Sequence, residues 1–242
     1  MSIRETTILK GVAILFMLYL HLFNQMANVN LCTTYLSIRG VPFVHLFSRC
    51  TGPVAFYLIL SGYGLYISSK SGRKQNSLKR ILKLYVHYWI TLILFIPLGC
   101  RVIGSQVYPF MLGAMLVKYD IINKCKLWRC KSLFILLLLM VVRMYLETGV
   151  FHVLYSVAFI VLFVQIKRPV WLDTFLYEMG CRSTSMWFVH TYFCYYLFKD
   201  FIYGFKYPLL IFSVLLVVSY LFALVIDRIY QPLQQLITQK WR

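Results

Sequence analysis

Two histidines lie deep inside apolar stretches of the chain, where an imidazole is costly and therefore informative. His21 ends the run LKGVAILFMLYLH, and His190 lies within MWFVHTYF. By default, a polar side chain at such a depth faces a water-filled cavity or a partner inside a helical bundle. A hydrogen-bonded core histidine is the alternative at each position. Two such histidines in different stretches favour a shared polar cavity, in which an imidazole could move a proton or carry a transferred group.

Lys10 falls on the same face as His21 if the first apolar stretch forms one helix. The two side chains are then roughly 16 Å apart along the axis, and their directions differ by only about 20°. Arg80 and Lys83 form a second basic feature, because they are three residues apart in LKRILKLYVHYW and share one helical face. Such cations suit phosphate groups, and arginine binds phosphate in a bidentate manner. Ordinary cytoplasmic charge or a contact with anionic lipid is the alternative.

Small polar residues accompany the histidines. Ser61 and Gly62 lie in FYLILSGYGLY, where small residues allow close helix packing, and Ser183 opens the stretch that contains His190. We predict no metal site, because His, Asp and Glu do not cluster at metal-ligand spacing and HExxH is absent.

The cysteines are predicted to be structural or incidental. Cys32 and Cys50 flank the longest stretch outside the predicted spans and could pair if that side is oxidising.

The elements that must position these residues are membrane-spanning helices. Hydrophobic residues make up 61% of the 242 residues and charged residues only 13%, a composition that excludes an ordinary soluble domain. We therefore predict an all-α, polytopic transmembrane bundle forming a single domain over residues 1–242. About eight spans are expected, at 8–27, 50–68, 84–103, 106–118, 132–146, 149–166, 184–203 and 207–228.

The basic residues set the expected orientation. The chain has 25 Lys and Arg against 7 Asp and Glu, and the cations gather in short connections rather than on one polar face. The positive-inside rule explains this pattern better than nucleic-acid binding, so we expect no nucleic-acid partner. It places both termini in the cytoplasm and the stretch from about Asn28 to Arg49 outside. No cleavable signal peptide is expected, because the first apolar run lacks a small-residue cleavage site.

These motifs resemble, in the same order, those of acyltransferase 3, a family of integral-membrane proteins that O-acylate sugars of the bacterial envelope. LKGVAILFMLYLH is similar to the opening motif, with Lys10 and His21 in its basic and histidine positions. FYLILSGYGLY resembles the second-helix signature, with Gly62 as its glycine, and LKRILKLYVHYW resembles the basic start of the third helix. GCRSTSMWFVHTYF is similar to the late motif, which leads from a polar cluster that includes Ser183 to His190.

The resemblance implies transfer of an acyl group, most often acetyl, from cytoplasmic acyl-CoA to a hydroxyl of a glycan or a lipid-linked saccharide. His21 would be the catalytic residue, acting as a neutral general base or as a transient acyl carrier. Lys10, Arg80 and Lys83 would hold the CoA phosphates, and Ser61 and His190 would supply hydrogen bonds to the acceptor or to the developing oxyanion. Acetyl-CoA would be a donor substrate, and no permanently bound cofactor is expected. The expected location is the bacterial inner membrane, among membrane lipids.

The chain departs from that family in length. Its members have about ten spans, whereas this chain passes from LFIPLGCRVIG almost directly to YPFMLGAMLV. A shortened enzyme, a subunit that needs a membrane protein partner and an inactive relative all remain open. The competing function from another class is a membrane carrier in envelope polysaccharide export.

Overall fold

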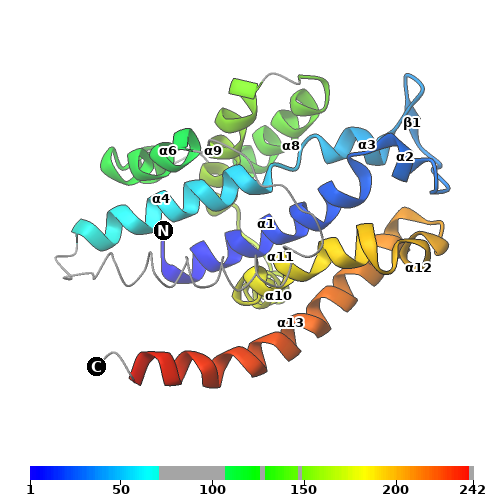
Figure 1. Cartoon of the computed structure of the whole chain (residues 1–242). Coiled ribbons are helices and arrows are strands. Elements are labelled where there is room, and N and C mark those ends of the chain that lie inside the picture. Colours follow the sequence, from blue (N-terminus) through cyan, green and yellow to red (C-terminus); the bar gives the residue numbers. More distant parts are fainter. Residues whose placement is uncertain (71–106, 126–128, 147–148, 240–242) are drawn as a thin grey trace.

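A computed structural model describes residues 1–70, 107–125, 129–146 and 149–239, and these are mainly helical (Figure 1). The first helix, α1 (Ile3–Phe23), runs through the middle of the molecule. It begins before residue 8, the predicted start, because Ser2 and Glu5 form a capping box. The Ser2 hydroxyl accepts from the Glu5 N–H at 3.1 Å, and the Glu5 carboxylate accepts from the Ser2 N–H at 2.6 Å.

One side of α1 is covered by four helices. They are α4 (Pro53–Lys70) and, at the top of Figure 1, α6 (Val107–Lys118), α8 (Arg129–Tyr145) and α9 (Gly149–Gln165). The short α7 (Ile121–Lys124) follows α6. Helices α4 and α6 are in backbone contact at Gly113, where an added Cβ would lie 2.0 Å from the carbonyl oxygen of Ile59. A small residue is therefore required at this crossing.

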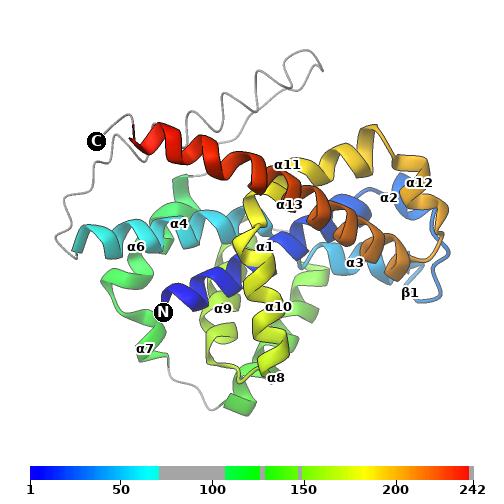
Figure 2. The same cartoon turned by 90° about the horizontal axis from the view of Figure 1, so that it is seen from below.

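The opposite side of α1 is covered by α10 (Val170–Cys181), α11 (Ser183–Thr191) and α13 (Pro208–Gln239). The sequence predicts no membrane span between residues 166 and 184, and α10 occupies most of this stretch. Helix α10 crosses α1 steeply (Figure 2). Their backbones touch at two glycines, because a Cβ on Gly11 would meet the Leu176 carbonyl oxygen at 1.9 Å and one on Gly180 would meet that of Thr7 at 1.9 Å.

The span predicted at 184–203 is not one helix. After α11 the chain forms a π-helix, η2 (Tyr192–Tyr196), and then the short α12 (Lys199–Gly204). The bond from the Leu197 N–H to the Tyr192 carbonyl, at 2.7 Å, closes the wider turn. Segments of π-helix such as η2 are rare and often occur at functional sites.

Helix α13 exceeds the predicted span 207–228 and continues to Gln239.

The segment predicted to lie outside the membrane is ordered and includes strands, which the all-α prediction missed. It holds α2 (Met26–Val29), a hairpin of β1 (Ser37–Ile38) and β2 (Val41–Pro42), and α3 (Phe43–Ser48). Arg39 and Gly40 form the two-residue turn with φ of 51° and 77°, the left-handed geometry that favours tight hairpins. Cys32 and Cys50 are both free thiols, so the pairing considered for them is not formed.

Within the described residues, three helical segments are long and apolar enough to cross a membrane: Ile3–Phe23, Phe43–Ser68 and Pro208–Arg228. The spans predicted at 106–118, 132–146 and 149–166 correspond to helices, but these are shorter, and the span at 84–103 lies outside the described residues. The count of eight spans and the side of each terminus stay predictions. The N-terminus and the end of α13 lie toward the same end of the molecule (Figures 1 and 2).

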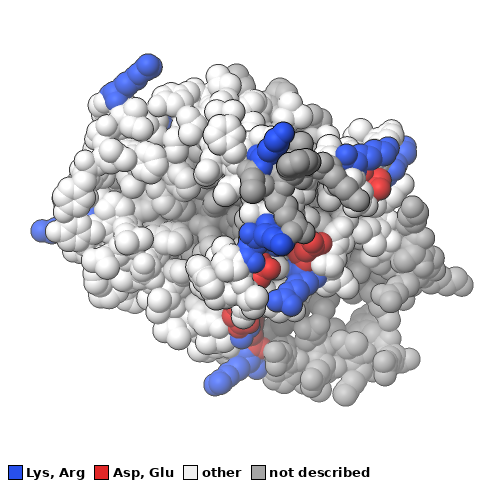
Figure 3. Space-filling model, turned by 180° about the vertical axis from the view of Figure 1, so that it is seen from behind, with Lys and Arg blue, Asp and Glu red and all other residues white. Residues whose placement is uncertain are grey.

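The surface supports a membrane setting. In the view from behind, charged side chains of the described residues gather right of centre and leave a broad uncharged area on the left (Figure 3). Leu209, Val217 and Val225 of α13 are all more than half exposed. Apolar side chains on this scale are expected to face lipid rather than water.

Candidate active site at the C-terminal end of α1

His21 and His190, the two deep histidines of the sequence, lie in direct ring contact. Their centroids are 4.8 Å apart, and the planes meet edge to face at 85°. His21 is partly buried near the end of α1, whereas His190 on α11 has no exposed surface. The structure therefore brings together two imidazoles that are 169 residues apart in sequence, as expected of costly polar groups in different stretches.

Each imidazole keeps one buried nitrogen without a hydrogen-bond partner in the described structure. The His190 Nδ1 lies 3.2 Å from the Met186 carbonyl oxygen. Because a carbonyl only accepts, that nitrogen carries the proton and Nε2 is left as an acceptor. The unpartnered atoms are His190 Nε2 and His21 Nδ1. Buried polar atoms in native proteins almost always have partners, so these two atoms are available to a bound molecule.

Tyr195 completes this cluster and was not anticipated from the sequence. It lies in η2, its ring centroid is 5.5 Å from that of His21, and its hydroxyl donates to the His21 carbonyl at 2.8 Å. Tyr203 of α12 makes the equivalent bond one residue further on, to the Leu22 carbonyl at 3.0 Å. The π-helix and α12 are thus fastened to the end of α1. The TYFCYY sequence alone gives no signal that one of these tyrosines would face His21.

Lys10 lies on α1 with His21 and is exposed in the N-terminal half of the helix. Its carbonyl oxygen is 3.4 Å from the Tyr57 hydroxyl, and the Tyr57 ring stacks on Trp187 with centroids 5.9 Å apart. Arg80 and Lys83 lie outside the described residues, so their relation to Lys10 stays a prediction.

The other predicted site residues lie apart from the histidine pair or serve packing. Ser61 is exposed on α4, and Gly62 beside it is buried. Ser183 is buried and donates to the Gly180 carbonyl at 2.9 Å. Its neighbour Ser185 donates to Asp227 of α13 at 2.6 Å, which connects α11 to α13. Within the described residues, neither Ser61 nor Ser183 is hydrogen-bonded to an imidazole. The bond from Ser183 to the Gly180 carbonyl favours a structural role for Ser183.

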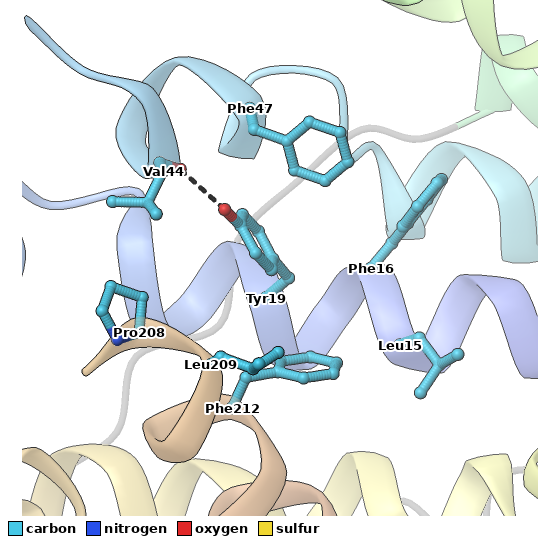
Figure 4. Close-up of a pocket in the computed structure, with 8 residues that line it drawn as sticks. All are labelled: Leu15, Phe16, Tyr19, Val44, Phe47, Pro208, Leu209 and Phe212. Atoms are coloured by element: carbon cyan, nitrogen blue, oxygen red, sulfur yellow. Dashed lines mark hydrogen bonds between the residues drawn. The ribbon is translucent and has the colours of Figure 1, made fainter. Parts of the chain in front are cut away.

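An apolar groove of about 450 Å³ lies beside α1, and Figure 4 shows its residues. The hydroxyl of Tyr19 in this groove is already bonded to the Val44 carbonyl at 3.2 Å. The groove therefore offers a hydrophobic surface rather than a reactive group. Its lining comes from α1, α3 and α13: Leu15, Phe16, Tyr19, Val44, Phe47, Pro208, Leu209 and Phe212.

The family model for the catalytic region of heparan-alpha-glucosaminide N-acetyltransferase matches residues 3–177, which extend from α1 into α10. Comparison with curated proteins and with solved structures gave no match. The match includes Lys10, His21, Ser61 and Gly62, and it ends before Ser183 and His190. The family differs from acyltransferase 3, which the motifs resemble, but both are families of membrane acyl transfer to saccharides. The chain belongs to the heparan-alpha-glucosaminide N-acetyltransferase catalytic family, a family of membrane acetyltransferases.

Proposed function

We propose that this protein transfers an acetyl group from acetyl-CoA to a saccharide within the membrane, with His21 as the catalytic residue. The contact between His21 and His190 carries the proposal, because it places two imidazoles, each with a buried unpartnered nitrogen, in one site. An acyl transfer needs a group that takes a proton from the attacking nucleophile and returns it to the leaving group, and a neutral imidazole does both.

In the general-base route, His21 removes a proton from the acceptor as its nitrogen or oxygen attacks the thioester carbonyl. The new C–N or C–O bond forms, the C–S bond breaks, and the proton on the imidazole passes to the CoA sulfur. In the covalent route, an imidazole nitrogen of His21 attacks the thioester carbonyl first, the C–S bond breaks, and the imidazole proton passes to the CoA sulfur, so that CoA leaves as its thiol. The acceptor then attacks the acetyl-imidazole, the N–C bond to His21 breaks, and the acceptor's proton returns to the imidazole. In either route the buried His190 Nε2 can accept a hydrogen bond from a protonated group in the site and so orient that group.

The donor would enter from the end of α1 that carries Lys10. An extended pantetheine arm is suited to the offset of roughly 16 Å between Lys10 and His21 along α1. Lys10, Arg80 and Lys83 would bind the CoA phosphates at the cytoplasmic side, and the thioester would meet the imidazole at the far end. Exposure of Lys10 on the described surface supports this arrangement.

The acceptor would be an amine or a hydroxyl of a saccharide. The matched family is described as an N-acetyltransferase of a glucosaminide, which supports an amino sugar. The four-motif resemblance supports a hydroxyl of a cell-envelope glycan, with the protein in a bacterial inner membrane. Both acceptors use the same catalytic step, because each loses one proton as its acyl bond forms.

Radiolabelled acetyl-CoA tests the proposal. Purified full-length protein would be mixed with acetyl-CoA labelled in the acetyl group and with glucosamine or glucose. Hydroxylamine treatment of the product separates the two acceptors, because it cleaves O-acetyl esters and leaves N-acetyl amides intact. We expect labelled sugar that depends on the protein. Binding of acetyl-CoA without transfer to any sugar, including glycans extracted from the source cells, would contradict the proposal.

A further inference from the structure

A second pocket, also of about 450 Å³, opens at the same end of α1 and is basic. Leu20 and Asn24, which lie on either side of His21 in sequence, form its α1 wall. Arg49 follows α3, whereas Arg143 and His152 come from α8 and α9. Among the described residues that line it, none carries a carboxylate. His45 and His152 both line this pocket.

Arg143 is the residue that requires a ligand. Arg143 is only 9% exposed, and within the described part of the chain its guanidinium has no carboxylate partner. One terminal nitrogen donates to the Leu146 carbonyl, and the other lies 3.4 Å from His152 Nδ1. The remaining donor, Nε, is buried without any partner. A buried guanidinium that meets only neutral groups is costly, and an anion in the pocket would compensate its charge.

The pocket is held in shape by close packing. A Cβ added to Gly52 would lie 2.3 Å from the Cε1 atom of His152, so only glycine leaves room for this ring. Arg49 donates to the Met144 carbonyl at 3.3 Å, which fixes its guanidinium against α8. His45 Nδ1 lies 3.0 Å from the Phe23 carbonyl at the end of α1. These contacts join α1, α3, α8 and α9 around one basic cavity.

We propose that this pocket binds an oxyanion, a carboxylate, sulfate or phosphate, carried by the acceptor saccharide. The planar fork of arginine donors matches such groups and distinguishes them from neutral hydroxyls. Asn24 follows His21 by less than one helical turn, so an anion held in the pocket anchors the adjoining sugar beside the imidazole. The assignment to the acceptor rests on the proposed transfer at His21, whereas anion binding itself does not.

The first arm measures binding without any need for activity. Full-length protein in neutral-lipid nanodiscs, with saturating acetyl-CoA present, would be titrated with inorganic sulfate at constant ionic strength, and thermal unfolding would be followed. Arg49→Gln and Asn24→Asp are the pocket variants, and Arg39→Gln on the exposed hairpin is the matched control for lost charge. We expect a saturable rise in the unfolding midpoint for wild type and Arg39→Gln, and its loss in both pocket variants. Arg143→Gln is added where it folds.

The second arm compares acceptors that differ by one anionic group, glucosamine and glucosamine 6-sulfate. We expect the KM of the sulfated sugar to be lower by about tenfold or more in wild type, the worth of one good charge-assisted contact. This advantage should disappear in Arg49→Gln and persist in the control variant Arg39→Gln. Nanodiscs with anionic lipid test the lipid headgroup as the source of the anion.

The outcomes are separable. Sulfate binding that depends on the pocket in a protein without transferase activity supports the anion site and contradicts the proposed function. Normal transferase activity without any rise of the unfolding midpoint in sulfate overturns the anion site. So does an equal loss of that rise in Arg39→Gln and in the pocket variants. Protection by anionic lipid that Arg49→Gln abolishes, without any preference for the sulfated sugar, overturns the assignment to the acceptor.

Discussion

At the residue scale, the reactivity of the site depends on which nitrogen of each imidazole carries a proton. The Met186 carbonyl fixes the proton of His190 on Nδ1, so Nε2 faces the site as an acceptor. We infer that His190 acts by orienting a hydrogen-bond donor in the site and does not attack the substrate itself. We assign it a positioning role beside His21.

Two substitutions of His190 separate this role from simple packing. An asparagine amide can replace the Nδ1 donor, and a glutamine amide can reach the place of Nε2. We expect His190→Asn to lower kcat by about tenfold, which corresponds to the loss of one hydrogen bond in the site. His190→Gln should keep a higher kcat than His190→Asn. Steady-state rates and the KM for acetyl-CoA check this prediction. Equal losses in both variants, with unchanged unfolding midpoints, would contradict it.

Tyr195 and Tyr203 form a natural pair for comparison. Both hydroxyls donate to carbonyls at the end of α1, but only the ring of Tyr195 contacts His21. We expect Tyr195→Phe and Tyr203→Phe each to reduce the free energy of unfolding by about 1 kcal/mol. Only Tyr195→Phe should also slow acetyl transfer, because its bond fixes the residue that carries the imidazole. Chemical unfolding and transfer rates measure the two effects. A matching fall in rate in Tyr203→Phe would show that the contact with His21 is not specific.

At the element scale, the position of His21 depends on how closely α10 crosses α1. Gly180 faces the Thr7 carbonyl without space for a methyl group, whereas nothing lies within 4 Å of a Cβ added to Gly204 on α12. We expect Gly180→Ala to destabilise the protein by about 1–3 kcal/mol, because the helices must separate. Gly204→Ala should be neutral or slightly stabilising. Thermal unfolding of both variants in the same detergent provides the comparison, and equal midpoints would rule out the close crossing.

The elements differ in how far the sequence predicts them. Long apolar runs predict α1, α4 and the first part of α13, because the need to satisfy every backbone group in lipid leaves few other structures. The cost of a deep imidazole favours a shared polar cavity for His21 and His190, whereas the contact between their rings is a finding of the structure. The crossing at Gly11 and Gly180, the π-helix with Tyr195 and the basic pocket were not predicted. Each depends on contacts between segments distant in sequence, which periodicity and local composition do not encode.

At the scale of the whole molecule, the proposed route of the donor requires Lys10 and the hairpin to face opposite sides of the membrane. Lys10 is exposed near the N-terminal end of α1, and Arg39 lies in the hairpin beyond its other end. In a background in which the seven native cysteines are replaced, we expect Arg39→Cys in intact cells to react with a membrane-impermeant maleimide and Lys10→Cys to react only after permeabilisation. Labelling of Lys10→Cys in intact cells would place Lys10 outside the cell and contradict the predicted topology.

The central claim is that His21 carries out the acetyl transfer. The decisive measurement is the rate of transfer from labelled acetyl-CoA by purified His21→Ala, compared with wild type and with Ile3→Ala, whose residue on the same helix is 87% exposed. With equal protein levels and unfolding midpoints, we predict a rate lower by about 10²- to 10⁴-fold in His21→Ala, the usual contribution of a general base, and an unchanged rate in Ile3→Ala. A His21→Ala rate close to that of wild type would contradict the account.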